Sequence, residues 1–202
     1  MGHYTGPKAK VNRRLGAVIY ESRGAMRAAD RRPSPPGMHT RPKRPSNYGA
    51  ALMEKQKIKH YYGIGEKQLR RYFDHAKHSK GNTGENLLTL CERRLDNVVR
   101  RAGLAMTRSQ ARQGIVHGHF LVNGSKVDKP SYQLRPGEVV SVRNREKLQI
   151  LYRSIHADAS GNTASFLSSD PETLSATFDS VPGPDDICLP VDVNMVVEFM
   201  SR

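Results

Sequence analysis

The stretch "GIVHGHFLVNGSKV", residues 114–127, joins two periodicities and decides how the surrounding chain folds. Apolar residues recur at helical spacing before it, whereas Phe120 and Val122 fall on one side of an alternating run after Gly118. That glycine suits the left-handed position beyond a helix, and the Asn-Gly pair that follows is the strongest short hairpin signal. Residues 132–143, "YQLRPGEVVSVR", add a Pro-Gly turn and another strand. The sequence therefore predicts a helix, a glycine stop and antiparallel strands in succession.

Two histidines one glycine apart could bind a metal or could mark the joint between the helix and the hairpin. A zinc site needs three or four ligands, and no Cys, Asp or Glu lies among residues 97–127. His117 falls in the last helical turn, where the helix dipole favours a cationic ring, and His119 falls at the start of the strand. We interpret the pair as the joint and predict no metal. His117 is expected either to contact phosphate or to be a satisfied surface residue.

The helix before the joint is predicted to have an N-cap and to be amphipathic. Thr107 is expected to cap it, with Gln110 at the capping-box position three residues on. Arg108 and Arg112 lie one turn apart and are expected to point outward. Ile115 is expected to point into the core. The outward arginines are therefore candidates for an RNA contact.

Further helices are predicted upstream. The segment "KGNTGENLLTLCERRLDNVVRRAG" (80–103) is typical of a turn followed by one helix that ends at its last glycine. Thr83 or Thr89 could cap that helix, and the Gly-rich turn before it could be either a phosphate-binding nest or an ordinary turn. The preceding run "EKQLRRYFDHAKHSK" (66–80) places apolar and aromatic residues on one helical stripe and Lys and Arg on the other. We expect that stripe to be core and the basic side to be a contact surface.

The charge of the chain is strongly asymmetric. The formal net charge is +14, yet residues 158–202 hold one Arg against eight acidic residues, so the preceding part is highly basic. A region with this excess of positive charge favours a polyanionic partner. No apolar run approaches the roughly 18 residues of a membrane-spanning helix. Nucleic acid is therefore the expected partner. Two distant cysteines, Cys91 and Cys188, are expected to be buried thiols rather than a disulfide.

The predicted helix pair, short strand and Asn-Gly hairpin, with Arg on the helices, resemble the RNA-binding module called the S4 domain. The resemblance extends beyond this module to bacterial-type small-subunit ribosomal protein S4, whose motifs occur here in family order and spacing. It covers nearly the whole chain and thins at 20–40 and 153–185. The motifs are "YTGPKAKVNRR", "SNYGAALMEKQKIKHYYGI", "GNTGENLL", "RRLDNVV", "TRSQARQ", "HGHFLVNG", "KPSYQLRPGEVVSVR" and "LPVDVNMVVEFMSR".

The resemblance implies an α+β fold in three parts. These are a basic N-terminal extension (1–45), a small all-helical domain (46–90) and an S4-type RNA-binding domain (91–185), in which a helix pair packs on a small, mostly antiparallel sheet. Residues 186–202 are expected to pack back onto the helical domain. Rich in Gly and Pro and poor in apolar residues, the extension is expected to be loosely ordered in the free protein. It lacks the four cysteines with which some family members bind zinc.

The family further implies a structural protein, not an enzyme, that binds the 5′ domain of small-subunit (16S) ribosomal RNA, acts early in subunit assembly and influences translational accuracy. Expected partners are this RNA, neighbouring small-subunit proteins near the path by which mRNA enters, and, as a further candidate, mRNA. We expect no cofactor, no metal, no membrane and no homo-oligomer, and a cytoplasmic location in the small subunit. We make no RNA prediction for the polar segment 157–170. The expected RNA-contacting side chains are Lys8, Arg13, Arg14, Lys43, Arg44, Tyr48, Lys55, Lys57, Lys67, Arg70, Arg71, Lys80, Asn82, Thr83, Arg93, Arg94, Thr107, Arg108, Gln110, Arg112, Gln113, His117 and Asn123.

Two other classes of protein contain similar modules. Pseudouridine synthases carry their catalytic aspartate in an Arg-Leu-Asp sequence, and Arg94-Leu95-Asp96 has the same letters. Arg93 and Arg100 lie three residues before and four residues after Asp96, so a helix-surface ion pair explains this aspartate. No segment outside the binding module resembles a catalytic domain. A free-standing RNA-binding stress factor would lack the N-terminal extension and the helical region, and both are present.

Overall fold

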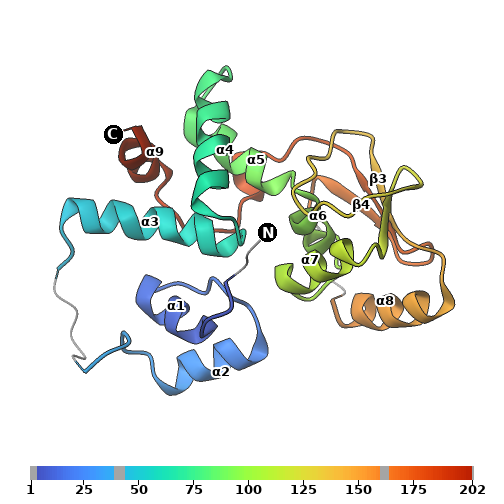
Figure 1. Ribbon diagram of the computed structural model, residues 1–202, viewed down its shortest axis with the longest axis horizontal. Coiled ribbons are helices and arrows are strands. Elements are labelled where there is room, and N and C mark those ends of the chain that lie inside the picture. The colour runs from blue at the N-terminus through green and yellow to red at the C-terminus, as the bar shows by residue number, and fades with distance from the viewer. Residues whose placement is uncertain (1–3, 39–43, 160–163, 202) are drawn as a thin grey trace. The chain divides into compact units, whose positions relative to one another are not determined.

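The computed structural model describes residues 4–38, 44–159 and 164–201. Helices and antiparallel strands both occur, which confirms the α+β class (Figure 1). The contacts divide the chain into two compact units, and the division falls once within a helix and once near the C-terminus. Within the described ranges, no helix combines the length and the apolar character that a membrane crossing requires.

Unit 1, formed by Met1–Leu87 and Cys188–Arg202, is helical wherever regular structure is described. Ser46 caps α3 by accepting a hydrogen bond from the Gly49 amide, 3.2 Å away. The last helix, α9, packs against α3 although more than a hundred residues separate them in sequence. The helices of unit 1 are α1 (Lys8–Leu15), α2 (Arg23–Arg31), α3 (Asn47–Tyr61), α4 (Glu66–His78), the start of α5 (Thr83–Glu92) and α9 (Val193–Ser201).

The N-terminal extension differs from the loosely ordered segment that its composition suggests. It contains α1 and α2, joined by a loop that hydrogen bonds to one buried side chain. The Oδ1 atom of Asn12 accepts from the Ile19 and Tyr20 amides, and its Nδ2 atom donates to the Tyr20 carbonyl. Arg13 donates to the Ser34 carbonyl at 2.8 Å. These hydrogen bonds order the extension together with a few buried apolar side chains, among them Val11, Leu15 and Ile19.

The segment 80–103 forms two helices where the sequence predicts one. Between α5 and α6 (Leu95–Arg101), Arg94 is extended and pairs with Gln133 as an isolated antiparallel bridge. The first two amides of α6 then donate to backbone carbonyls of residues 130–132 instead of to a side-chain cap. Because these partners lie more than thirty residues away in sequence, local helix signals do not reveal the break.

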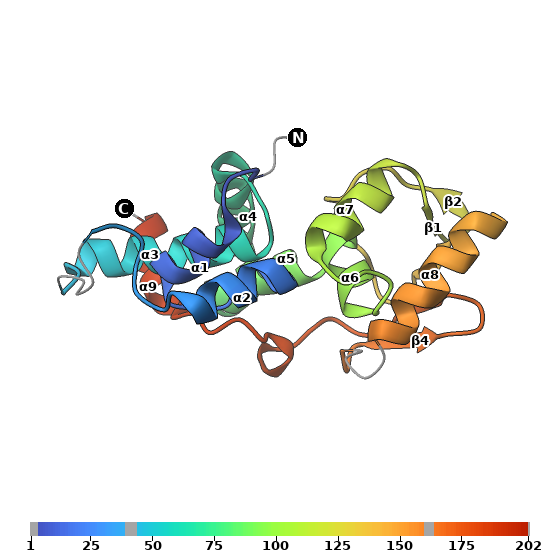
Figure 2. The same cartoon turned by 90° about the horizontal axis from the view of Figure 1, so that it is seen from below.

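Unit 2, formed by Leu88–Ile187, packs helices on a sheet that has five strands in the described part of the unit. The strands are ordered β2-β1-β3-β5-β4, and every neighbouring pair is antiparallel. Helix α8 lies alongside the sheet and contacts β3 (Figure 2). The remaining elements of unit 2 are α7 (Arg108–Val116), β1 (Phe120–Val122), β2 (Ser125–Lys126), β3 (Val139–Val142), α8 (Glu146–Ala159), β4 (Leu167–Asp170), β5 (Ser175–Phe178) and a 3-10 turn (Pro184–Asp186).

The predicted joint between helix and hairpin is confirmed. Gly118 has φ +70° directly after α7, and Asn123 and Gly124 have φ +47° and +77° between β1 and β2. Both turn residues thus adopt the left-handed conformation that a tight hairpin requires. Phe120 pairs with Val142 across β1 and β3, which keeps the apolar faces of the two strands together.

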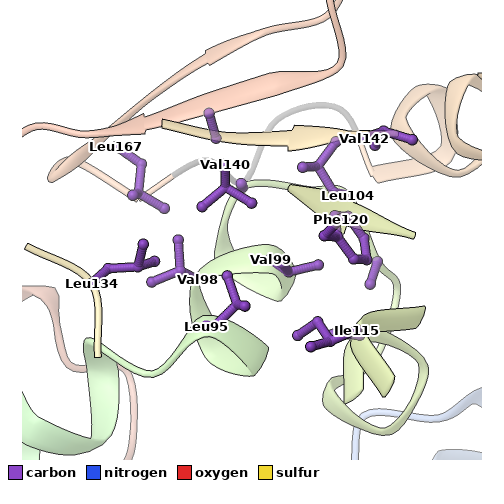
Figure 3. Close-up of a cluster of buried hydrophobic side chains, with 14 of the residues drawn as sticks. Leu95, Val98, Val99, Leu104, Ile115, Phe120, Leu134, Val140, Val142 and Leu167 are labelled. Atoms are coloured by element: carbon purple, nitrogen blue, oxygen red, sulfur yellow. The ribbon is translucent and has the colours of Figure 1, made fainter. Parts of the chain in front are cut away.

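The core of unit 2 lies between the sheet and the helix pair α6–α7 (Figure 3). Side chains of the helices point toward those of the strands (Figure 3). Ile115, which was predicted to point into the core, is buried, and so are Phe120, Val140 and Val142. Burial of this apolar surface is the main force that holds the helix pair on the sheet. The labelled core residues are Leu95, Val98, Val99, Leu104, Ile115, Phe120, Leu134, Val140, Val142 and Leu167.

Candidate RNA interface

Helix α4 presents an exposed basic face opposite a buried apolar one. Its predicted core stripe of Leu69, Tyr72, Phe73 and Ala76 is confirmed as buried. The cations on the opposite side are exposed, and none makes a hydrogen bond or an ion pair within the part of the chain that the structure describes. Unpaired cations on a rigid helix are suited to phosphate contacts. These exposed side chains are Lys67, Arg70, Arg71 and Lys77.

The Gly-rich turn before α5 is fixed by a hydrogen bond to the side chain of Asn82. Asn82 accepts a hydrogen bond from the Gly84 amide at 2.9 Å, so Asn82 rather than Thr83 caps the helix. Any Cβ at position 84 would collide with Val193 of α9, so this glycine allows close packing. The Gly84 amide is therefore not available to an anion. Lys80, beside the turn, is exposed.

Two lysines of α3 were predicted to contact RNA, but neither side chain is well exposed to solvent. Lys55 is buried, with its ammonium 2.5 Å from a Glu66 carboxylate oxygen and 4.8 Å from the Phe199 ring centroid. Lys57 lies 2.7 Å from a Glu54 carboxylate oxygen, and both side chains are only 16% exposed. Lys55 is therefore not on the surface, as an RNA contact would require, and its ammonium links α3 to Glu66 of α4 and Phe199 of α9. Lys57 is largely occupied by its ion pair.

The helix pair α6–α7 is joined by an ionic cluster around Asp96. This carboxylate is almost completely buried and lies 2.8 Å from an Arg94 nitrogen and 2.5 Å from an Arg112 nitrogen. Arg108 donates to the Asn97 side-chain oxygen at 2.9 Å. The predicted outward orientation is therefore wrong for Arg112, and Arg94, 1% exposed, cannot reach RNA. Both arginines hold the fold together.

The expected ion pair between Asp96 and its helical neighbours Arg93 and Arg100 does not form. Asp96 is the second residue of α6 and turns inward, whereas Arg93 lies before the helix and donates through Nε to the Leu134 carbonyl at 2.9 Å. The prediction assumed one continuous helix through this region. Breaking that helix at Arg94 changes which residues share a face.

A polar edge of α7 remains exposed. Thr107 accepts a hydrogen bond from the Gln110 amide, which confirms the predicted cap, and the Gln110 side chain accepts from the Met106 amide. Gln113 and His117 are exposed, and their side-chain nitrogens lie 2.7 Å apart. These side chains could hydrogen bond to phosphate, sugar or an unstacked base.

Of the other predicted RNA contacts, some side chains interact with other parts of the protein and some are exposed. Lys8 lies over the Tyr20 ring, and the Asn123 side-chain oxygen accepts from the Val139 amide at 2.9 Å. Arg14, Arg44 and Tyr48 are exposed, whereas Lys43 lies outside the described residues.

Three residues near the joint are missing from the predicted contact set: His119, Lys126 and Arg145. His119 contacts the Tyr152 hydroxyl through Nδ1 at 3.0 Å, while Lys126 and Arg145 are exposed. The alternation of the hairpin could have placed Lys126, since it follows the turn on the exposed strand β2. No local pattern connects Arg145 to the histidines, because β3 and its preceding turn lie between them.

Cysteine burial follows the prediction at one position only. Cys91 is buried, and burial raises the pKa of its thiol. Cys188 is exposed, so the expectation of a buried thiol is wrong there. Among the described residues, no group of three or more His, Cys, Asp and Glu side chains is arranged to hold a metal ion.

His60 makes the stability of unit 1 sensitive to acid. Its Nδ1 atom lies 3.2 Å from the Tyr20 hydroxyl, and its ring packs edge-on against Tyr4 at 5.2 Å between centroids. Burial lowers the pKa of His60 below its usual 6.5, and the nearby charges of Lys59 and Arg14 lower it further. The folded state thus favours the neutral ring, so its contribution is complete above about pH 6.5 and is lost as the pH falls below that value.

We therefore expect the free energy of unfolding to fall between pH 7 and pH 5, and His60→Gln to show a shallower fall. Denaturant titrations at several pH values measure both slopes. His75→Gln, on the exposed side of α4, is the matched control and should retain the slope of the original chain. An undiminished slope in His60→Gln would contradict this assignment.

Comparison with known proteins agrees with the two units. The family of the ribosomal protein S4/S9 N-terminal domain matches residues 3–92, and the S4 domain family matches residues 93–140. Small ribosomal subunit protein uS4 of Rhodopirellula baltica is 65% identical over 202 residues. The uS4 proteins of Persephonella marina and Thermus thermophilus are 44% identical over 207 residues and 42% identical over 209 residues. Each comparison covers 100% of both chains.

Full-length identity at this level agrees with the motif order, the α+β fold and the hairpin joint. The chain belongs to the family of small ribosomal subunit protein uS4 and carries the S4 domain of that family.

Proposed function

We propose that this chain is a structural constituent of the small ribosomal subunit and binds the 5′ domain of 16S ribosomal RNA directly. Membership of the uS4 family and the S4 domain at 93–140 support the ribosomal and RNA-binding role. The exposed, unpaired cations of α4 are the single observation that carries a direct RNA contact. A-form RNA offers phosphates and 2′-hydroxyls to such a surface, because its major-groove edges are inaccessible to side chains.

The proposal includes a place and a time of action. The protein acts early in subunit assembly, lies near the path by which mRNA enters and influences translational accuracy through neighbouring small-subunit proteins. It works in the cytoplasm and does not form a homo-oligomer, and mRNA is a further candidate partner. The family resemblance supports each of these finer assignments.

The family consists of structural ribosomal proteins rather than enzymes, which removes the pseudouridine-synthase alternative. The geometry gives a physical reason as well. Asp96, the residue required for that chemistry, is 2% exposed and paired with Arg94 and Arg112. A carboxylate held in this way cannot reach a base in solution.

The test uses the double variant Arg70→Ala/Arg71→Ala and a transcript of the 5′ domain. Each lost phosphate contact should reduce the slope of log affinity against log salt by roughly 0.7 to 0.9. Each should also weaken binding on the order of tenfold, since an Arg–phosphate hydrogen bond is charge-assisted. RNA titrations at several salt concentrations measure both effects, with thermal unfolding to show that α4 stays folded.

Asp74→Ala is the matched control, because Asp74 is exposed on the same helix and carries the opposite charge. It should bind RNA at least as tightly as the original chain. An unchanged salt slope in the double variant would remove α4 from the interface. Salt-independent binding by the original chain, or loss of binding on adding a chelator, would contradict the proposed RNA recognition itself.

A further inference from the structure

The joint between α7 and β1 gathers basic side chains from separate parts of unit 2. The rings of His117 and His119 lie 5.8 Å apart, centroid to centroid, on either side of Gly118 in sequence. A Cβ at Gly118 would lie 3.2 Å from the Lys126 ammonium and closer still to its aliphatic chain. Lys126 therefore lies across the glycine that separates the two histidines. The φ of +70° at this position is one that residues with a side chain rarely adopt, so it favours glycine.

His119 is oriented by a buried tyrosine. Its Nδ1 atom lies 3.0 Å from the hydroxyl of Tyr152 on α8, and burial raises the pKa of that hydroxyl to about 12. Tyr152 therefore keeps its proton near neutral pH. Its hydroxyl can donate to a neutral ring and can accept from a protonated one, so the contact persists in both states. Among the described residues, Nε2 of His119 has no hydrogen-bond partner.

The charges around this joint are mostly positive. The charged groups on the neighbouring segments are Lys126 on β2, Asp128 and Lys129 directly after it, Arg143 and Arg145 after β3, and Glu146 and Lys147 at the start of α8. None of these forms an ion pair within the described ranges. The two carboxylates, Asp128 and Glu146, still leave an excess of positive charge, and an excess of this kind favours an anion.

The same surroundings disfavour a charged ring in the absence of an anion. Burial lowers the pKa of His119, and the nearby His117 and Arg145 lower it further. A bound phosphate would reverse these effects, because its negative charge favours the imidazolium form.

We propose that His117, His119 and Lys126 form a phosphate site at which RNA binding is coupled to proton uptake. The inference rests on the proposed RNA-binding function and adds its regulation by pH. A phosphodiester group seated here accepts hydrogen bonds from the Lys126 ammonium and from protonated imidazole rings. Because Lys and Arg stay charged between pH 8 and pH 6, the histidines supply the pH dependence of this site.

The experiment titrates the full chain with the 5′-domain transcript at constant salt and at pH 6, 7 and 8. Affinity should rise as the pH falls, by about tenfold for each pKa unit by which RNA raises a histidine pKa. The double variant His117→Gln/His119→Gln should lose most of this rise in affinity between pH 8 and pH 6. Lys126→Ala, the control for a cation that does not titrate, should bind more weakly at every pH and still bind more tightly in acid.

Proton NMR provides a second and independent measurement. The imidazole resonances of His119 should titrate at higher pH in the RNA complex than in the free chain. An equal pH dependence of affinity in the histidine variant and the original chain, with normal salt dependence, would overturn the proton-linked site and leave the proposed RNA binding intact. Failure of the original chain to bind the transcript at any pH would overturn both.

Discussion

Asp96→Asn is expected to lower the free energy of unfolding of the chain by about 3–5 kcal/mol. The carboxylate lies within 2.8 Å of Arg94 and 2.5 Å of Arg112, and Arg94 is 1% exposed. Removing its charge takes an ionised partner away from a buried guanidinium, and that group cannot regain water without opening the α6–α7 contact. Chemical denaturation followed by circular dichroism measures the change.

Asp128→Asn is the matched control, because Asp128 is exposed in the same unit and forms no ion pair among the described residues. Its effect should stay within about 0.5 kcal/mol. A loss below about 1 kcal/mol for Asp96→Asn would mean that the cluster contributes little to stability. Arg112 would then again be a candidate for the RNA-binding surface.

Ile115→Ala should destabilise the chain by about 2–5 kcal/mol, because it removes buried methyl and methylene groups and leaves a cavity between α7 and the sheet. Ile115 has no exposed surface and packs in the same core as Phe120. Thermal and chemical unfolding measure the loss. At temperatures where the variant stays folded, its RNA affinity and salt slope should match those of the original chain.

The adjacent residue provides the control for this second substitution. Val116 is 54% exposed on the same helix, so Val116→Ala should change the free energy of unfolding by less than about 0.5 kcal/mol. If the two variants were equally stable, the assignment of faces on α7 would be wrong. A reduced salt slope in Ile115→Ala, with the chain folded, would instead place this residue close to RNA.

Local patterns in the sequence predicted the features whose causes are local. The glycine stop at Gly118, the Asn-Gly turn, the Thr107 cap and the inward strand residues each depend on neighbours within a few positions. The apolar stripe of α4 was predictable for the same reason, since helical periodicity alone places its residues on one side. The order of the sequence motifs, which matches that of the ribosomal protein S4 family, then identified the S4 domain.

Features that depend on distant partners were not predictable in this way. Lys55 and Arg94 have the charge of surface residues, yet Glu66 and Asp96 make their burial favourable. Helix α8 and the β4–β5 hairpin also went unpredicted, although β5 pairs with β3 in the sheet. For the candidate RNA site, sequence supplied the exposed α4 cations but not the grouping of Lys126 with the histidine pair.

The packing of α9 against α3 has a consequence for the order of folding during translation. Unit 1 is interrupted by Leu88–Ile187, so its final helix leaves the exit tunnel only after the whole of unit 2 has been synthesised. Domains generally fold as units while the nascent chain is still growing. Unit 2 can therefore complete its core first, while Lys55 still lacks the Phe199 ring and Gly84 still lacks its neighbour Val193. The newly made chain thus acquires a finished S4 domain before its helical unit can close.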